Sequence, residues 1–351
     1  MTTASGADRT DARVAVVGAG SWGTALSGML AEKGHRVRLW AHESEVAREI
    51  RDRRVNQAYL PDHELPRGLE ATDSLAEALD GAEVVVSVSP SQFVDRVMGE
   101  AAAHLDPEAL VVSASKGLEV GTLRRMDQVL EAHLEEEQFE RLAVLSGPSF
   151  ASEVAGRAPT AVVVASRSEE ARLEAQQVFQ TDAFRVYTNP DIVGVELGGA
   201  LKNVVALATG VTAGLGFGYN TRAALITRGL AEITRLGLAM GAERRTFMGL
   251  AGMGDLVLTC TGELSRNRTV GYRLGRGESL EEVLGGMRSV AEGVRTAEAA
   301  CELARRHGVE MPIAEQVQAI LTAGRDPRAA VHELMTRDPK PEDWASSPAG
   351  R

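Results

Sequence analysis

The segment from Gly18 to Gly23, which reads GAGSWG, constrains the fold of this chain more than any other feature. It directly follows the apolar run Val14 to Val17 and opens a stretch of small residues. A buried strand that ends in glycines and leads into a helix is the arrangement that binds dinucleotides. Gly18 permits the tight turn, Gly20 lets the backbone approach a pyrophosphate, and Gly23 lets the helix pack on the sheet. A purely structural glycine turn is the alternative, but this context favours a nucleotide site.

The composition is typical of a soluble enzyme. A length of 351 residues suggests two domains, and the dispersed net charge of −11 argues against nucleic acid or an anionic membrane as a partner. No apolar run approaches the roughly 20 residues of a membrane helix, and no secretory signal is evident, so we expect a cytoplasmic protein without membrane insertion. Cys260 and Cys301 are too few for a disulfide framework, and the scattered histidines predict no metal site.

The pattern of apolar residues predicts an α/β protein. Its first half alternates short apolar runs with amphipathic stretches, which is typical of a Rossmann-type, doubly wound, mostly parallel sheet. The expected strands are Val14–Val17, Val37–Trp40, Val84–Val88, Leu110–Ala114, Leu142–Leu145 and Ala161–Val164. Helical spacing dominates the second half and predicts an all-α C-terminal domain. We therefore expect a disordered start at 1–11, a dinucleotide-binding domain at 12–189, a helical substrate domain at 190–335 and a disordered tail at 336–351.

The residues after the second expected strand bear on the choice of nucleotide. An acidic residue about 20 positions past the glycines usually holds the ribose hydroxyl of NAD. Glu43 lies at this position, whereas the neighbouring His42 would favour a 2′-phosphate, so NAD and NADP both remain open. A solvated loop is the alternative for both residues. Phe93 is a further candidate for packing on the cofactor, with a core position as the alternative.

Two segments place polar groups just past expected strands, where open parallel sheets bind ligands. Lys116 lies in SASKG, and a lysine at such a strand end favours a functional role. Gly147 and Ser149 lie in SGPSFA and offer N–H and hydroxyl donors, with an ordinary turn as the alternative.

Lys202 lies on a predicted helix, ELGGALKNVV, that is otherwise almost free of charge. Burial lowers the pKa of a lysine ammonium, which suits proton transfer near neutral pH. We interpret Lys202 as catalytic, with a solvated surface lysine as the alternative.

The segment from Gly252 to Asn267 is the candidate substrate site. Ser265, Arg266 and Asn267 combine a hydroxyl, a forked guanidinium and an amide, which suits a phosphate group, although such a triplet is often a helix cap. Asp255 would orient Lys202 or hold a substrate hydroxyl, with helix capping as the alternative.

Taken in order, these motifs resemble the NAD(P)-dependent glycerol-3-phosphate dehydrogenases of the bacterial type. The resemblance covers about residues 12 to 330 and is carried by GAGSWGTAL, SASKGLE, SGPSFASEVA, ELGGALKNVVALATG, AGMGDLVLTC, SRN and SVAEGVRTA. The serine in SGPSF is a threonine in many relatives, and either hydroxyl can donate a hydrogen bond.

This resemblance implies roles for individual residues. It makes Lys202 the catalytic lysine and Lys116 a second active-site lysine, and we count Asp255 with them. Substrate-binding candidates are Lys116, Gly147, Ser149, Lys202, Asn203, Asp255, Thr259, Ser265, Arg266 and Asn267. With the residues named above, the cofactor-binding candidates are Gly18, Gly20, Ser21, Trp22, Gly23, His42, Glu43, Phe93, Lys116, Ala151, Arg266, Val290 and Glu292.

The resemblance also implies a reaction, which is reversible hydride transfer between NAD(P)H and dihydroxyacetone phosphate. It further implies a homodimer that supplies sn-glycerol 3-phosphate for glycerophospholipid synthesis. Two alternatives remain: a related dehydrogenase of another hydroxy acid or of ketopantoate, with Arg266 binding a carboxylate, and a non-catalytic nicotinamide sensor. An enzyme has a use for a lysine on an apolar helix, whereas a sensor has none.

Overall fold

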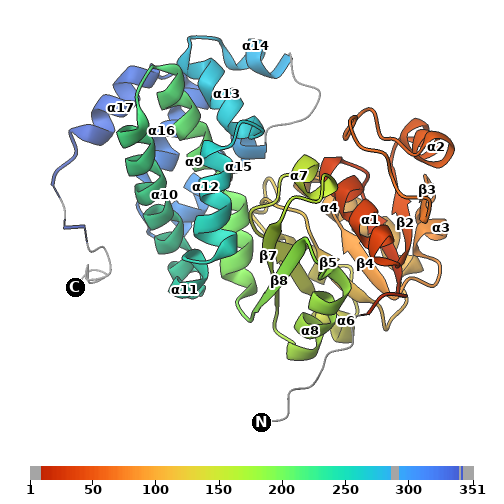
Figure 1. The fold of residues 1–351 in the computed structure, drawn as a ribbon. Coiled ribbons are helices and arrows are strands. Elements are labelled where there is room, and N and C mark those ends of the chain that lie inside the picture. The colour runs from red at the N-terminus through yellow and green to blue at the C-terminus, as the bar shows by residue number, and fades with distance from the viewer. Residues whose placement is uncertain (1–8, 286–291, 340, 343–351) are drawn as a thin grey trace. The chain divides into compact units, whose positions relative to one another are not determined.

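The structure is a computed structural model that describes residues 9–285, 292–339 and 341–342. The chain divides into two compact units, each of which is described by itself (Figure 1). We call the first the sheet unit; it holds the chain up to Ala200 and Gly241–Asp255. The second, the helical unit, holds Leu201–Met240 and the chain from Leu256 onward.

The sheet unit contains one eight-stranded sheet in the order β3-β2-β1-β4-β5-β6-β7-β8. Neighbouring strands are parallel except for β6 and β7, which are antiparallel. β2 and β3 lie on one side of β1, and the chain crosses to the other side between β3 and β4, which makes the junction of β1 and β4 the switch point typical of doubly wound sheets. This confirms the predicted fold class. The strands are β1 (Arg13–Val17), β2 (Arg36–Trp40), β3 (Leu69–Thr72), β4 (Val84–Ser87), β5 (Leu110–Ser113), β6 (Ala143–Ser146), β7 (Thr160–Ser166) and β8 (Phe184–Asn189).

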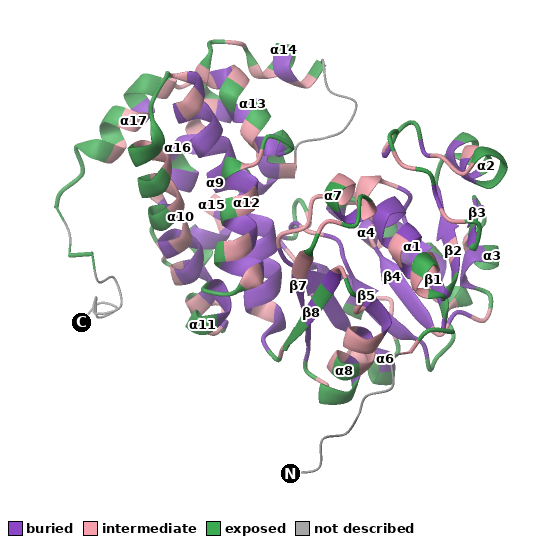
Figure 2. Cartoon of the chain, viewed as in Figure 1, coloured by how far each residue is buried: buried purple, intermediate pink, exposed green. Residues whose placement is uncertain are grey.

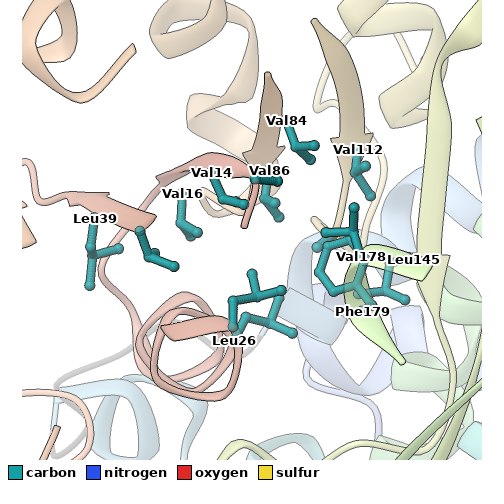
Figure 3. Packing of buried hydrophobic residues seen from close by; sticks show 14 of the residues in the cluster. Val14, Val16, Leu26, Leu39, Val84, Val86, Val112, Leu145, Val178 and Phe179 are labelled. Atoms are coloured by element: carbon teal, nitrogen blue, oxygen red, sulfur yellow. The ribbon is translucent and has the colours of Figure 1, made fainter. Parts of the chain in front are cut away.

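Helices cover both faces of this sheet because successive strand residues point to opposite faces. Val14 and Val16 pack with Leu26 in one buried cluster (Figure 3), whereas Ala15 and Val17 belong to a second cluster. Both faces are therefore apolar, as parallel sheets require. The helices of this unit are α1 (Ser21–Lys33), α2 (Ser44–Arg53), α3 (Leu75–Leu79), α4 (Ser91–Ala101), α5 (Met126–Glu131), α6 (Glu136–Arg141), α7 (Ala151–Ala155), α8 (Glu169–Phe179) and α11 (Arg244–Phe247), together with the 3₁₀ turn Ala102–His104.

All six expected strands are present, with ends shifted by at most two residues. The sequence prediction was wrong in omitting β3 and β8, which are the two edges of the sheet. In β8 the residues Phe184 and Val186 are buried, whereas Arg185 and Tyr187 are exposed. An edge strand buried on one side has no continuous apolar run, which is the pattern that identified the inner strands.

The helical unit is built from α-helices in the part of the chain that the structure describes. Two of its helices, α9 and α12, begin in the sheet unit. The helices are α9 (Ile192–Gly214), α10 (Tyr219–Ala239), α12 (Asp255–Thr261), α13 (Arg266–Gly275), α14 (Leu280–Gly285), α15 (Glu292–Arg306), α16 (Pro312–Ala323) and α17 (Pro327–Met335). The predicted boundary at residue 190 remains a prediction.

Helix α9 corrects the expectation that no apolar run approaches membrane length. Its 23 residues are long and apolar enough to cross a membrane by length and composition. However, 94% of its most apolar window is buried within the protein (Figure 2). Core helices of soluble proteins pass the same test, so α9 is weak evidence for a membrane span.

The predicted disordered ends fall largely outside the described residues. Residues 1–8, 340 and 343–351 are not described. Within the predicted N-terminal segment, Arg9 forms ion pairs with Glu174 at 2.6 Å and Glu83 at 3.2 Å. Arg9, near the end of the N-terminal segment predicted to be disordered, therefore contacts the rest of the sheet unit.

Glu232 on α10 is a buried carboxyl that caps another helix. Its oxygens accept the N–H of Ile313 at 2.9 and 3.1 Å and that of Ala314 at 3.4 Å, at the start of α16. Burial raises the pKa of Glu232 from 4.5 to about 7, against the opposing effect of these N–H groups. The ionised form is therefore less favourable in the folded protein than in the unfolded chain.

This shift predicts a pH-dependent effect of Glu232→Gln. The pKa of Glu232 is about 7 in the folded protein and 4.5 in the unfolded chain. The protonated carboxyl therefore stabilises the folded protein, fully so below the lower pKa, and this contribution is lost as pH rises through the higher pKa. We expect the unfolding free energy of the wild type, relative to the variant, to fall by up to about 3 kcal/mol between about pH 5 and about pH 8. Urea unfolding at both pH values measures this difference.

The matched control is Glu298→Gln, which changes an exposed carboxyl on α15 of the same unit. We expect its unfolding free energy to follow the wild type at both pH values. A constant difference between Glu232→Gln and the wild type would contradict the assignment.

Candidate active site

The glycine turn after β1 has the close contacts that the sequence predicted. Gly18 has a φ of +129°, and its N–H donates to the Trp40 carbonyl at 3.1 Å, which joins the turn to the end of β2. A Cβ built on Gly23 would lie 1.9 Å from the Gly18 oxygen, so only glycine fits there. A Cβ on Gly20 would meet no atom within 4 Å, so the backbone at this position faces open space.

The start of α1 fits a dinucleotide pyrophosphate. The N-cap residue Gly20 supplies no side-chain cap, so it leaves the first N–H groups of α1 for a ligand. Trp22 also has a buried Nε1 atom with no hydrogen-bond partner among the described residues. In contrast, the Ser21 hydroxyl donates to the Tyr59 carbonyl at 2.6 Å.

The end of β2 brings together the two residues that bear on the nucleotide. The His42 ring lies 5.9 Å from the Trp40 ring, between centroids. Glu43 accepts a hydrogen bond from the Tyr59 hydroxyl at 3.0 Å. Burial, and then the Glu43 carboxylate, raise the pKa of Tyr59. The sequence analysis missed Tyr59 because no spacing rule identifies a loop tyrosine 16 residues away.

Lys116 follows β5 and forms a largely buried ion pair with Asp255. Its Nζ lies 2.8 Å from Asp255 Oδ2 and donates to the Gly147 carbonyl at 3.0 Å. The side chains are 16% and 1% exposed, respectively. The structure thus brings together three predicted site residues from distant parts of the chain. Asp255 thus pairs with Lys116, and the expectation that Asp255 orients Lys202 or holds a substrate hydroxyl remains a prediction.

Glycines allow this approach because side chains would block it. A Cβ on Gly198 of α9 would lie 2.5 Å from the Ala251 oxygen. A Cβ on Gly199 would lie 2.7 Å from Ser146 Oγ and 3.8 Å from Lys116 Cδ. Ala251 belongs to a π-helical turn, Leu250–Gly254, that leads directly to Asp255, and such turns are frequent at functional sites. The glycine pair in ELGG is therefore a packing signal that the sequence analysis did not use.

The segment after β6 contributes a carbonyl acceptor. Gly147 has a φ of +135°, and its carbonyl accepts from the Ser149 hydroxyl at 3.1 Å as well as from Lys116. Ala151, two residues after Ser149, begins α7. The segment therefore contacts the ion-paired lysine through a carbonyl acceptor, and its predicted role as a source of N–H and hydroxyl donors remains a prediction.

The helical unit holds the other predicted residues. Lys202 and Asn203 are buried, and Asn203 Nδ2 lies 3.5 Å from Glu292 Oε2. The Gly293 N–H donates to Asn267 Oδ1 at 2.9 Å. Asn203, Glu292 and Asn267 therefore converge on the start of α15.

Two other predicted residues lie at the start of α13, and a third lies within α12. Ser265 caps α13, since its hydroxyl accepts the Arg268 N–H at 3.3 Å, so the capping alternative holds for this residue. Arg266 is exposed at the first position of α13, and Thr259 is buried on α12.

Two cofactor-binding candidates belong neither to the contacts around Lys116 nor to those at the start of α15. The side chain of Phe93 is 44% exposed, and the Arg96 guanidinium lies 5.7 Å from the centre of its ring. Val290 lies outside the described residues. Among the residues that the structure describes, no group of three or more His, Cys, Asp and Glu side chains is arranged to hold a metal ion. The roles of all site residues remain predictions.

The doubly wound sheet, its uncapped glycine turn and the acidic residue after β2 are typical of a dinucleotide-binding protein of the Rossmann class. Two family models match the chain. The N-terminal model of the NAD-dependent glycerol-3-phosphate dehydrogenases matches residues 13–172, and the C-terminal model matches residues 191–332. The chain belongs to this family.

Individual relatives agree with the family match. A glycerol-3-phosphate dehydrogenase [NAD(P)+] of Citrifermentans bemidjiense is 58% identical over 330 residues, which cover 94% of this chain and 98% of the relative. One from Geobacter sulfurreducens is 58% identical over 332 residues, covering 95% and 99%. The crystal structure of glycerol-3-phosphate dehydrogenase from Coxiella burnetii superposes with a TM-score of 0.88 at 41% identity, covering 93% of this chain and 99% of that one.

These findings confirm the resemblance predicted from the sequence. They support an oxidoreductase that uses NAD or NADP over a non-catalytic sensor, and they support the glycerol-3-phosphate dehydrogenases over dehydrogenases of other hydroxy acids. The names of these relatives give the cofactor as NAD(P)+ and so do not distinguish NAD from NADP.

Proposed function

We propose that this protein catalyses reversible hydride transfer between NAD(P)H and dihydroxyacetone phosphate, with sn-glycerol 3-phosphate as the reduced product. The observation that carries the proposal is the buried pair of Lys116 and Asp255, fixed to the Gly147 carbonyl just past the ends of β5 and β6. A cation held at the carboxyl ends of parallel strands is well placed for an anionic substrate. The family match supplies the class of substrate.

Lys202 is the proton donor in this mechanism. When bound, the nicotinamide cofactor supplies the hydride that adds to the carbonyl carbon. Negative charge then develops on the carbonyl oxygen, which the Lys202 ammonium stabilises and protonates. In the reverse direction the neutral amine takes the hydroxyl proton. Lys202 follows Gly199 by three residues on α9, and residues three apart on a helix lie on the same face.

The substrate phosphate is bound by groups at the start of α13. Arg266 offers a forked guanidinium and Asn267 an amide, both of which bond well to phosphate oxygens. Binding the phosphate orients the carbonyl, so that remote binding energy lowers the barrier to hydride transfer.

Arg266→Ala tests this binding role. We expect KM for dihydroxyacetone phosphate to rise at least about tenfold, because charge-assisted hydrogen bonds contribute roughly 1.5–3 kcal/mol. Initial rates at varied substrate give this value. Arg276→Ala removes an exposed guanidinium at the other end of α13 and is the matched control, with KM unchanged. A KM in Arg266→Ala equal to that of the control would argue against phosphate binding.

The activity itself is tested by the oxidation of each reduced cofactor with three substrates. Loss of the reduced nicotinamide absorbance is followed with dihydroxyacetone phosphate, oxaloacetate and ketopantoate. We expect rapid oxidation with dihydroxyacetone phosphate alone. Faster oxidation with either carboxylate would instead favour a hydroxy-acid or ketopantoate dehydrogenase, and oxidation with none of them would favour the sensor.

We further propose that the protein acts as a cytoplasmic homodimer that supplies sn-glycerol 3-phosphate for glycerophospholipid synthesis. Light scattering should give about twice the chain mass of 37.3 kDa, and the mass of a single chain would contradict the dimer.

A further inference from the structure

Arg125, Asp127 and Glu196 form a buried cluster of ionisable side chains that the mechanism above does not use. The first two lie at the start of α5, and Glu196 lies on α9. Arg125 Nη2 lies 3.0 Å from Asp127 Oδ2, and Nη2 of the more exposed Arg167, just after β7, lies 3.6 Å from the same atom. The side chains of Asp127 and Glu196 are 0% and 5% exposed. Buried ionisable groups need partners, so this cluster joins three segments of the sheet unit to one another.

Glu196 is the protonated member of the cluster. Burial, and then the charge of the Asp127 carboxylate and a side-chain hydrogen bond with it, raise the pKa of Glu196 well above its usual range. With both carboxyls ionised, the buried atoms Asp127 Oδ1 and Glu196 Oε2 have no hydrogen-bond partner among the described residues. One proton on Glu196 Oε2 gives both atoms a partner, because the hydroxyl donates to Asp127 Oδ1. The two guanidiniums face Asp127, so the proton belongs on Glu196.

Glu196 also fixes the backbone at the start of α5. Its Oε1 atom accepts the Asp127 N–H at 3.0 Å. Because α5 begins at Met126, this N–H is one of the first donors of the helix, which have no acceptor within the helix itself. Glu196 therefore joins α9 to the point where the loop between β5 and α5 ends.

The same loop carries Lys116, and its two ends are paired with each other. Leu118 and Arg125 form an antiparallel bridge, and the Glu119 N–H donates to the Arg124 carbonyl at 2.9 Å. The backbone just after Lys116 is thus tied to the residues that precede α5. A displacement at the start of α5 is passed to Lys116 through these bonds.

Helix α9 contacts the loop at both of its ends. Gly199 follows Glu196 by three residues, and residues three apart lie on the same face of a helix. A Cβ on Gly199 would lie 3.8 Å from both Cγ and Cδ of Lys116, so the lysine side chain passes close to the helix at this glycine. At the other end of the loop, Glu196 bonds to Asp127. One face of α9 therefore holds the loop at two points.

We propose that Glu196 is a positioning residue of the active site, which anchors the loop that presents Lys116 to Asp255 and to the substrate. Glu196 acts on the reaction through Lys116. Without this anchor, Lys116 leaves its bonds to Asp255 and to the Gly147 carbonyl more often. The effect on catalysis rests on the proposed function, whereas the position of Lys116 is measured independently of it.

The test measures how readily Lys116 reacts with acetic anhydride. The chain has four lysines, and peptide mass spectrometry follows the acetylation of each. Lys33 on α1 is the internal reference. A lysine held against a carboxylate stays charged and unreactive, so the ratio of the Lys116 rate to the Lys33 rate reports the position of Lys116 without turnover. We expect Glu196→Leu to raise this ratio at least about fivefold, because it removes both hydrogen bonds to Asp127 and keeps a good helix former.

A conservative variant and a matched control accompany Glu196→Leu. The Glu196→Gln amide accepts the Asp127 N–H and donates to Asp127 Oδ1, as the protonated carboxyl does, so its ratio should stay within about twofold of the wild type. Glu232→Leu removes another buried carboxyl that accepts N–H groups at the start of a helix, and it should leave the ratio unchanged. Melting temperatures establish that each variant is folded. Glu196→Asp withdraws the carboxyl by one bond and replaces Glu196→Leu if the latter does not fold, with a rise of at least about twofold.

A double-mutant cycle tests whether Glu196 acts through Lys116. Glu196→Leu should lower kcat/KM for dihydroxyacetone phosphate at least about tenfold in the wild-type background. In the Lys116→Ala background the same change should cost less than about twofold, because the side chain that Glu196 positions is absent. A purely structural role of Glu196 would give the same loss in both backgrounds.

Three results would overturn the inference. The first is an unchanged labelling ratio in folded Glu196→Leu, or in folded Glu196→Asp where that variant replaces it. The second is an equal rise in Glu196→Gln or in Glu232→Leu, and the third is an additive loss in the double-mutant cycle. A protein with the expected labelling that does not reduce dihydroxyacetone phosphate would support the positioning of Lys116 by Glu196 and contradict the proposed function alone.

Discussion

Lys202→Ala should lower turnover at least about a hundredfold, the low end for a lost general acid or base. The variant removes the buried ammonium from α9 and with it the proposed proton donor. Nucleotide binding should be retained, because the glycine turn and Glu43 belong to other elements. Steady-state rates and a nucleotide titration on the same preparation measure both quantities.

Two companion experiments distinguish proton transfer from charge alone. Lys202→Arg keeps the positive charge, but a guanidinium does not release its proton near neutral pH, so turnover should stay low. A small primary amine added to Lys202→Ala should restore part of the lost rate, because it can donate the proton in place of the side chain. Near-normal turnover in Lys202→Ala would remove the assignment.

Gly23→Ala should both destabilise the protein and weaken nucleotide binding. The new Cβ would lie 1.9 Å from the Gly18 oxygen, so the start of α1 must move away from the turn. Overpacking of this kind typically costs about 1–3 kcal/mol, and a clash with backbone belongs at or above the upper end. We expect ADP-ribose affinity to fall at least about tenfold.

Gly28→Ala is the matched control on the same helix. Its Cβ would lie 3.7 Å from Leu65 and 3.8 Å from Pro66, which are ordinary contacts. Alanine is favoured over glycine inside a helix by up to about 1 kcal/mol, so this variant should be as stable as the wild type or more so. Equal effects of the two substitutions on affinity would show that the close contact at Gly23 is not what forms the turn.

The sequence predicted those parts of the fold that depend on local patterns. Inner strands such as β4 are buried on both faces and form continuous apolar runs, which periodicity identifies. The edge strands β3 and β8 were missed because exposed charged residues, such as Glu70 and Arg185, interrupt their apolar runs. The antiparallel pairing of β6 and β7 also has no local signal, since strand direction depends on the connection between them.

The site shows the same division between local and long-range information. The glycine turn and Lys116 closely follow strands, so their positions at the carboxyl ends of β1 and β5 follow from the sequence. The bond between Lys116 and Asp255 joins residues 139 positions apart and is made possible by backbone packing at Gly198. No single-sequence rule gives such a pair, and the same is true of the Tyr59 hydroxyl on Glu43.

The most direct test of the central claim is the fate of the hydride. NADH carrying deuterium at both C4 positions is incubated with dihydroxyacetone phosphate and the wild-type protein, and the product is examined by mass spectrometry and NMR. The account predicts sn-glycerol 3-phosphate with a single deuterium, bound to its central carbon. Oxidation of the cofactor without deuterium at that carbon, or no oxidation at all, would contradict it.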